Sequence, residues 1–276
     1  MLLVSSNFLI WSAIFEKQKQ GDMEISFFNV GQGDSIFIQF KDGTDILIDG
    51  GPTNKILSLL SENLPFYDHH IDMVLLTHPH LDHVTGLIDV LKKYNVGMVL
   101  ESGAPYPTPE SQEFEQVIKE KNIRKIVIDH PVSVSFADSA ILKILLPTES
   151  FENKVLKNVH DSMMVSELDY ENKKILLMGD AEKKLEQKLT RENTIGVVDI
   201  LKVGHHGSKT SSTQNFLNVV RPRYAIISVG RNRFGHPNQE VLSRLLDFGI
   251  KTFRTDIHGT VRASITNGIL TLKPEK

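Results

Sequence analysis

Three imidazoles and a carboxylate lie within one short segment, residues 77–83, whose sequence is THPHLDH. His78 and His80 are two residues apart, so they project to the same side of an extended chain, whereas Asp82 and His83 are adjacent. Imidazole and carboxylate suit zinc, manganese or iron, and a neutral imidazole is a good ligand at physiological pH. The spacing predicts one pair of ligands for each of two metal ions. The competing interpretation is a polar loop that is merely rich in histidine.

Two later segments carry the same kinds of side chain at the ends of apolar runs. Asp180 follows residues 174–178, and His205 and His206 follow residues 198–203. An aspartate after a glycine is commonly only a turn or a helix cap, but it is also a good bridging carboxylate for two ions. Paired imidazoles are costly to bury without hydrogen-bond partners. We therefore expect one of the two histidines to bind a metal while its neighbour faces the substrate.

Two isolated histidines are weaker candidates. His160 precedes the apolar run at residues 163–169 and, taken alone, is more typical of a structural or exposed histidine. It becomes a candidate ligand because the first ion still needs another nitrogen. His236, in the segment FGHP at residues 234–237, is a candidate for contact with the substrate rather than for ligation.

Two glycine-containing turns near the amino end supply candidate supporting residues. Residues 29–35, NVGQGDS, contain Asp34. This turn either presents backbone amides to a phosphate or simply joins two strands of a hairpin. Asp49 follows the strand-like residues 45–48, where a carboxylate can orient a metal-bound histidine.

The elements that must position these residues alternate along the chain. Strands are expected at residues 23–29, 35–40, 45–48, 73–76, 97–100, 124–128, 141–146, 163–169, 174–178, 198–203, 225–229, 261–265 and 269–272. Helices are expected at residues 55–63, 83–94, 109–121, 183–189, 213–220 and 239–248. Because strands outnumber helices and are mixed with them, we expect an α/β (α+β) fold in one domain, residues 23–276, with two stacked sheets that are each covered by helices.

Composition narrows the chemistry. The chain has 276 residues, no cysteine and a net charge of -3. The lack of cysteine excludes disulfides, cysteine-ligated zinc and a thiol nucleophile, and the net charge argues against nucleic-acid binding by the whole surface. Between Asp199 and Glu240, however, there is no acidic residue, whereas basic residues stand at Lys202, Lys209, Arg221, Arg223, Arg231 and Arg233. This stretch predicts a positive face for an anionic substrate such as a phosphodiester; the alternative is solvated charge without a partner.

Residues 1–22 form an apolar amino-terminal segment and a polar linker. The apolar part, residues 1–15, is interrupted by polar residues and is shorter than the roughly 18 to 20 residues of a membrane span. It also lacks the positive start and the cleavage site of a signal peptide. Three interpretations stay open: a weak membrane anchor, an uncleaved signal-like segment, or the tail of a longer span. An anchored or extracytoplasmic location is compatible with each.

In this order, the segments resemble the metallo-β-lactamase superfamily of metal-dependent hydrolases, whose mark is His-x-His-x-Asp-His followed by a further His, an Asp and a His. More narrowly, the segments VGQGDS (30–35), ILIDGG (46–51), LKVGHHGS (201–208) and GHP (235–237) are similar to the carboxy-terminal domain of ComEC-type competence proteins. Phosphorylcholine esterases of the same branch share much of this pattern. The resemblance covers residue 23 to the carboxyl end and implies an αββα four-layer sandwich with a two-metal site.

The resemblance also implies roles for individual residues. The first ion would be bound by His78, His80 and His160, the second by Asp82, His83 and His206, and Asp180 would bridge both ions. His206 is preferred over His205 because the glycine after it resembles the terminal His-Gly of the superfamily. The residues implied in catalysis are Asp82, His205 and His236, and those implied in support or in a substrate loop are Asp34, Asp49 and Lys209.

The expected function is therefore a two-metal phosphodiesterase or nuclease with zinc or manganese, acting on a phosphoester such as single-stranded DNA. A phosphorylcholine-type esterase is an alternative, although it would need an aromatic cage for the ammonium, and aromatic residues make up only 7% of the chain. An alternative of another class is a non-catalytic accessory domain of a DNA-uptake or envelope assembly. Bound metal and cleavage of single-stranded DNA would discriminate between these functions.

Overall fold

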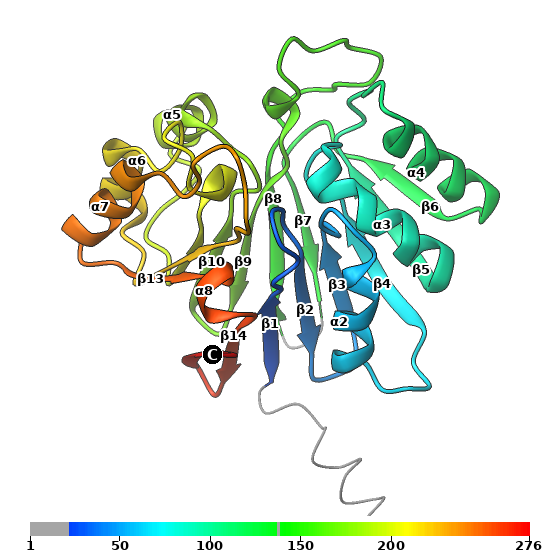
Figure 1. The fold of residues 1–276 in the computed structure, drawn as a ribbon, viewed down its shortest axis with the longest axis horizontal. Coiled ribbons are helices and arrows are strands. Elements are labelled where there is room, and N and C mark those ends of the chain that lie inside the picture. The colour runs from blue at the N-terminus through cyan, green and yellow to red at the C-terminus, as the bar shows by residue number, and fades with distance from the viewer. Residues whose placement is uncertain (1–21, 137–138) are drawn as a thin grey trace, which may run out of the picture.

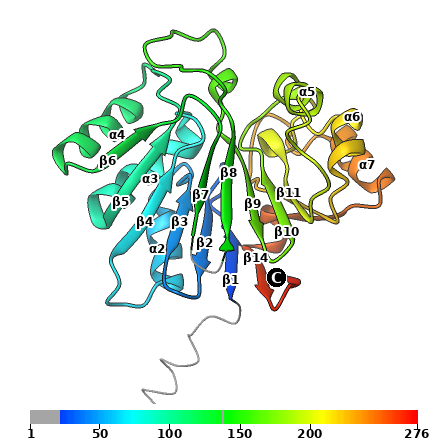
Figure 2. The ribbon, with the colours of Figure 1, turned by 180° about the vertical axis from the view of Figure 1, so that it is seen from behind.

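Two β-sheets stack face to face and are covered by helices on their outer sides (Figure 1). The computed structural model describes residues 22–136 and 139–276. Helices α2, α3 and α4 lie beside one sheet, and helices α5, α6 and α7 lie beside the other (Figures 1 and 2). The expected αββα sandwich is confirmed.

The larger sheet combines an antiparallel and a parallel half. Its strand order is β15 (Ile269–Pro274), β14 (Val261–Thr266), β1 (Met23–Phe27), β2 (Ile36–Phe40), β3 (Asp45–Ile48), β4 (His70–Leu75), β5 (Asn95–Glu101) and β6 (Arg124–Val127). Neighbours from β15 to β3 pair antiparallel, and those from β3 to β6 pair parallel. The parallel strands therefore end at one common edge of the sheet.

The smaller sheet has a similar division. Its order is β13 (Lys251–Arg254), β12 (Tyr224–Ile227), β11 (Ile200–Lys202), β10 (Lys173–Leu177), β9 (Val165–Tyr170), β8 (Ile141–Leu146) and β7 (Val132–Ser135). Strands β10 to β13 are parallel, and β7 to β10 are antiparallel. The sequence predictions omitted the two edge strands, β7 and β13. Each has four residues and is partly exposed, which weakens the apolar signal.

The helices form where apolar residues recur at helical spacing. They are α2 (Lys55–Asn63), α3 (Leu81–Lys93), α4 (Pro109–Glu120), α5 (Lys183–Arg191), α6 (Gln214–Val220), α7 (Gln239–Asp247) and the short α8 (Thr255–His258), which was not predicted. In α3 the buried positions include Val84, Leu87, Ile88 and Leu91, which make one face. The side chain of Thr108 caps α4 by accepting a hydrogen bond from the Ser111 amide.

Three layers of buried apolar side chains hold the sandwich together. The central cluster, which includes Ile25, Ile38, Ile144 and Ile226, lies between the sheets. Two further clusters join each sheet to its helices. A fully buried side chain of this size contributes roughly 1.5 to 3 kcal/mol through its removal from water, so the sheets form a stiff support for the loops at their edges.

The membrane interpretations of residues 1–22 concern a segment that lies almost entirely outside the described residues. Within residues 22–136 and 139–276, none of the helices has the length and apolar character that crossing a bilayer requires.

The loops after the parallel strands of both sheets meet at one edge of the sandwich. Residues 76–80 follow β4, residues 178–182 follow β10, and residues 203–213 follow β11. A backbone hydrogen bond joins the two sheets there, from the Met164 amide to the Thr77 carbonyl at 3.0 Å. The predicted ligand segments therefore converge although they are far apart in the sequence.

Candidate metal centre

Four side chains gather as a first cluster at this edge: His78, His80, His160 and Asp180. One ligand atom from each lies within 4.8 Å of the others. The ring of His160 approaches that of His80, with Nε2 and Nδ1 3.3 Å apart, and His78 Nε2 is 3.9 Å from Asp180 Oδ2. His160 is placed by a 3-10 turn, Val159–Ser162, in which Asn158 accepts a hydrogen bond from the His160 amide.

A second cluster shares Asp180 with the first and adds Asp82, His83 and His206. Nε2 of His206 lies 3.2 Å from Asp82 Oδ2 and 3.4 Å from Asp180 Oδ1. Nε2 of His83 lies 3.5 Å from Asp180 Oδ2. The structure thus brings together the seven predicted ligands in two groups of four with one carboxylate in common.

Several of these atoms are buried without a hydrogen-bond partner among the described residues. They are Nε2 of His78, His83 and His206, and Oδ1 of Asp180. Leaving a buried polar atom unsatisfied costs about 1 to 3 kcal/mol, so four at one spot need an explanation. Imidazole nitrogens and carboxylate oxygens that point at a common position are the donor set of a divalent metal ion, and these residues therefore fit such ions.

The histidines of the first cluster are held neutral. Burial keeps the pKa of His78 well below its usual range, and the nearby His83 acts in the same direction. Burial and His160 lower the pKa of His80 to about 4, and burial lowers the pKa of His160. A neutral imidazole keeps the lone pair that a metal ligand requires.

The second cluster balances two carboxylates with two imidazoles. Burial would lower the pKa of His83 and of His206, but Asp180 outweighs burial and raises both pKa values well above the usual range. Burial opposes ionisation of Asp82, but His83 and His206 outweigh it and lower the pKa of Asp82 to about 2. The pKa of Asp180 is likewise held well below its usual range against burial, by His206 and His83. Both carboxylates are therefore ionised at neutral pH, and cations stabilise such a cluster.

Asp49 fixes the orientation of the His83 ring through a hydrogen bond. Its Oδ2 accepts a hydrogen bond from His83 Nδ1 at 2.7 Å, and the amide and hydroxyl of Thr77 donate to the same carboxylate at 2.8 and 2.6 Å. The helix that carries His83 packs closely against the backbone at Gly50. A Cβ at Gly86 would lie only 2.0 Å from the Gly50 carbonyl oxygen, so the glycine permits this approach. With Nδ1 occupied, Nε2 of His83 is turned toward the cluster, as the sequence interpretation of Asp49 requires.

His206 is oriented by a second buried network. Its Nδ1 donates to the Ser228 carbonyl at 2.8 Å and lies 3.4 Å from Asp34 Oδ1. Asp34 in turn forms an ion pair with Lys202, whose ammonium also donates to the Gly179 carbonyl at 3.1 Å. His205 and His206 both adopt left-handed backbone conformations, with φ of 48° and 52°. Such conformations cost on the order of 1 to 3 kcal/mol and cluster at functional sites.

His205 lies beside the two clusters rather than within them. It is partly exposed, and its Nδ1 is 3.2 Å from Glu182 Oε1, which also accepts from the Thr210 hydroxyl at 2.7 Å. Its Nε2 is 3.9 Å from Asp180 Oδ2. The ring of His236 packs at 5.3 Å from that of His205. His206, rather than His205, therefore lies in the group with Asp82, His83 and Asp180, whereas His205 groups with His160 and Glu182.

The expected single positive face is wrong. Lys202 is fully buried in its ion pair with Asp34. Arg221 and Arg223 precede β12 and lie at the strand end opposite to the clusters, because the neighbouring Tyr224 pairs with Ile200 at the start of β11. Only three of the six basic residues stand in the loops at the site edge, and all three are exposed: Lys209, Arg231 and Arg233.

The glycine turn at residues 29–35 has a structural role. The Asp34 amide donates to the Asp82 carbonyl at 3.2 Å, and a Cβ at Gly33 would lie 2.3 Å from that oxygen. The turn therefore packs against the start of α3 and supports Asp82. The Asp34 amide is not available to a phosphate, because it already donates to the Asp82 carbonyl.

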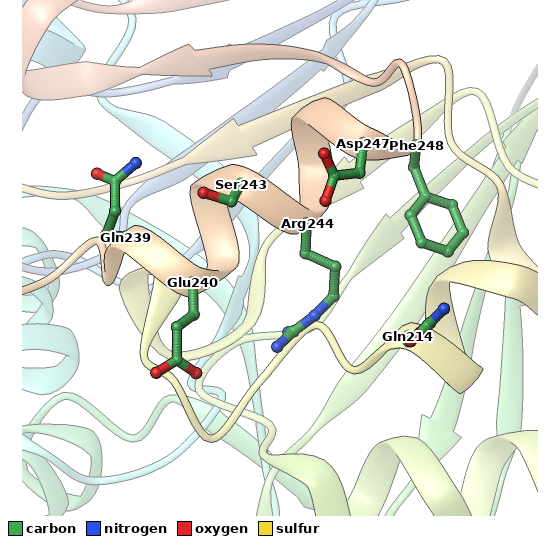
Figure 3. Close-up of a pocket in the computed structure, with 7 residues that line it drawn as sticks. All are labelled: Gln214, Gln239, Glu240, Ser243, Arg244, Asp247 and Phe248. Atoms are coloured by element: carbon green, nitrogen blue, oxygen red, sulfur yellow. The ribbon is translucent and has the colours of Figure 1, made fainter.

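A surface hollow of about 470 Å³ lies elsewhere, on the outer side of α7 and α6 (Figure 3). It is lined by Gln214, Gln239, Glu240, Ser243, Arg244, Asp247 and Phe248. Arg244 already donates to the carbonyls of Ser211 and Ser212 at 3.3 and 2.6 Å. This arginine supports the loop that follows the histidine pair, and the hollow contains none of the candidate ligands.

Three residues that lie near the clusters were not predicted as site residues: Thr77, Tyr106 and Glu182. The position of Thr77 beside His78 and of Glu182 two residues after Asp180 were available signals. Tyr106, whose ring lies 5.3 Å from that of His80, comes from a loop without any motif.

Comparison with known proteins agrees with this geometry. The profile of the metallo-beta-lactamase superfamily matches residues 28–231. ComE operon protein 3 of Bacillus subtilis is 28% identical over 266 residues, which cover 89% of this chain and 33% of that protein. Recombination protein 2 of Haemophilus influenzae is 31% identical over 261 residues, 91% of this chain and 30% of that protein. The chain thus spans about a third of the length of these curated relatives.

A solved structure supports the fold. The metallo-beta-lactamase fold protein YhfI from Bacillus subtilis superposes with a TM-score of 0.57 at 11% identity, covering 91% of this chain and 99% of that one. The profile match, the similarity to competence proteins and the two His/Asp clusters lead to one conclusion. The chain belongs to the metallo-beta-lactamase superfamily of metal-dependent hydrolases.

Proposed function

We propose that this domain is a two-metal phosphodiesterase that acts on single-stranded nucleic acid. The observation that carries the proposal is the convergence of unpartnered, buried ligand atoms from His78, His83, His206 and Asp180. The relatives support a nucleic acid as substrate, because one is named a recombination protein and another, ComA of Neisseria gonorrhoeae, is named a competence protein.

The chain offers a separate set of ligands for each ion. His78, His80 and His160 would hold one, Asp82, His83 and His206 would hold the other, and Asp180 would be shared. Two such ions, when bound, activate a water molecule for attack on phosphorus and offset the negative charge that develops on the phosphoryl oxygens. Zinc and manganese both suit these ligands.

The groups beside the ligands act on the leaving oxygen. Glu182 Oε1 lies 3.2 Å from Nδ1 of His205 and holds the ring so that Nε2 is directed toward Asp180. At that atom His205 can hold a proton for the leaving oxygen. His236 packs against the His205 ring and limits its rotation. Lys209, Arg231 and Arg233, exposed in neighbouring loops, are available to flanking phosphates.

The alternatives are separable by structure and by experiment. A phosphorylcholine esterase needs several rings around one ammonium, whereas Tyr106 and Phe234 contact different histidines, His80 and His236. A non-catalytic module would bind two ions and cleave no phosphoester.

The experiment compares His80→Ala and Asp180→Ala with wild type on a single-stranded oligonucleotide, with zinc or manganese added after chelation. Both variants are expected to lose metal-dependent cleavage while their circular dichroism stays that of the wild type. His130→Ala is the matched control, because His130 is exposed and, among the described residues, its ion pair is with its neighbour Asp129. Undiminished cleavage by a folded Asp180→Ala variant would overturn the proposal, and two bound ions without any cleavage would favour the module.

A further inference from the structure

The loop at residues 230–237 places an exposed aromatic ring next to the candidate metal centre. Phe234 is 74% exposed, and its ring lies 5.7 Å from that of His236 at an interplanar angle of 30°. A single exposed phenylalanine is ordinary on a protein surface. Three features distinguish Phe234 from such a residue. Its ring lies near the candidate metal centre, its loop is held by hydrogen bonds, and basic side chains lie beside it.

The loop is built around one side chain. The Asn232 amide group donates to the carbonyls of Gly230 and His236 at 2.9 and 2.7 Å, and its oxygen accepts from the amides of Phe234 and His236 at 3.0 and 3.1 Å. Four hydrogen bonds from one asparagine fix both ends of the turn. Phe234 is therefore presented at a defined position, which reduces the entropy cost of binding to its ring.

Phe234 ends a row of rings that crosses the site. Successive ring centroids along this row are 4.6 to 5.7 Å apart. In order, the rings belong to Tyr106, His80, His160, His205, His236 and Phe234. A substrate strand that leaves the metal centre past His205 and His236 would reach Phe234 next.

The charges on this loop fit a polyanion. Arg231 and Arg233 flank Asn232, both are exposed, and neither forms an ion pair with a carboxylate among the described residues. The segment from residue 200 to residue 239 contains no acidic residue. Free guanidinium groups beside an exposed ring are the combination that binds single-stranded nucleic acid, with phosphates on the cations and a base on the ring.

We infer that Phe234 is a base-stacking residue, which binds a nucleobase adjacent to the scissile phosphate while Arg231 and Arg233 bind the phosphates beside it. This inference rests on the proposed function and extends it, because it predicts that the site distinguishes a strand with bases from a bare sugar-phosphate chain. The face of an aromatic ring stacks on any base, so we expect little sequence preference.

The test measures binding and cleavage separately. Fluorescence anisotropy at 4 °C gives the Kd of the zinc-loaded full chain for a labelled thymidine oligonucleotide and for an abasic oligonucleotide of equal length and charge. Gel electrophoresis of the same samples reports cleavage. Stacking of one base is expected to make the Kd ratio of abasic to base-bearing strand roughly 5- to 100-fold. Phe234→Ala should bring this ratio toward one, and Phe234→Trp should keep or increase it.

Phe66→Ala is the matched control. Phe66 is 85% exposed but precedes β4, at the strand end opposite to the candidate metal centre, so this variant should keep the wild-type ratio. A wild-type ratio near one, or a Phe234→Ala variant that keeps the wild-type preference, overturns the inference even if the oligonucleotides are cleaved. A preference that depends on Phe234 without any cleavage overturns the proposed function and leaves the stacking role standing.

Discussion

The two halves of the candidate metal centre are supported very differently. In the second cluster, both histidines have their distal nitrogens fixed by buried partners, Asp49 for His83 and the Ser228 carbonyl for His206. In the first cluster, His78 Nδ1 lies 3.2 Å from the buried Thr77 hydroxyl, but the carboxylate nearest to His160 Nδ1 is Glu182, which lies 4.0 Å away and is partly exposed. Because outer partners fix the orientation and basicity of a metal ligand, we expect the second half to be the tighter and more rigid of the two.

The support of the second half continues into a buried ion pair, which has no counterpart beside the first half in the part of the chain that the structure describes. Lys202 and Asp34 are both buried and join the turn at residues 29–35 to β11. Burial alone would raise the pKa of Asp34, but Lys202 and His206 outweigh burial and lower it. The buried Lys202–Asp34 pair therefore supports the position of His206 in the second cluster.

The largest expected effect is on stability. Lys202→Met leaves Asp34 buried without its counter-charge, and breaking a buried pair by removing one partner costs about 3 to 5 kcal/mol. The free energy of unfolding of the metal-free chain, from urea titration, measures this loss. Lys209→Met is the control, because the exposed Lys209 forms none of the ion pairs of the described residues and a surface change of this kind stays within about 0.5 kcal/mol. Equal stability of both variants would show that the buried pair supports nothing.

Glu101 is a second buried carboxylate with a lysine partner, but its pKa is shifted in the opposite direction to that of Asp34. Glu101 pairs with Lys125 at 2.9 Å, but that lysine also binds Glu115. Burial, and next the charge of Glu115, raise the pKa of Glu101 from 4.5 to about 7. The folded state therefore binds more protons than the unfolded state between pH 4.5 and 7, so this group's contribution to stability falls as the pH rises through that range.

Glu101→Gln removes that titration. Relative to the variant, the wild type is expected to lose at most about 3 kcal/mol of unfolding free energy as the pH rises from 4.5 to 7. Urea titrations of both proteins at several pH values provide the measurement. Parallel stability curves over this range would contradict the elevated pKa of Glu101.

The smallest expected effects bear directly on the two halves. Asp49→Asn removes the charged partner of His83 and should weaken the tighter ion by roughly 10- to 100-fold. Glu182→Gln should weaken the other ion by less than about 10-fold, because Glu182 makes no hydrogen bond to His160 within the described residues. Calorimetric titration of the chelated protein with zinc measures both affinities without any turnover. Equal losses in the two variants would abolish the asymmetry.

The elements around the site were largely predictable because each carries a strong periodic signal. The predicted boundaries of the helix at residues 55–63 and of the strands at residues 45–48 and 141–146 match the structure. The strands β7 and β13 escaped because a short edge strand buries too little to show an alternating pattern. The predicted metal ligands lie together because most of them are in segments that follow parallel strands, and the ends of such strands meet at one edge of a sheet. His160 is the exception, because it lies in a turn before the antiparallel strand β9.

The sequence does not reveal which residue forms an ion pair with a given charged side chain. Lys202 was expected on a positive surface, yet the buried Asp34 lies 168 positions earlier in the chain and turns that lysine inward. Arg221 and Arg223 were expected beside it, but they lie before β12, at the opposite end of the sheet from Lys202 at the end of β11. Charge patterns along a sequence do not specify which end of a strand a residue occupies, whereas ligand motifs that follow strands do.

Native mass spectrometry of the chelated protein during a zinc titration counts the ions that each molecule binds. We expect two ions per chain at saturation, with a one-ion species populated first because the half around Asp82, His83 and His206 fills before the other. His160→Ala should leave that first step in place and weaken the second. Saturation at fewer than two ions, or a first step that disappears in His160→Ala but persists in His206→Ala, would contradict the account.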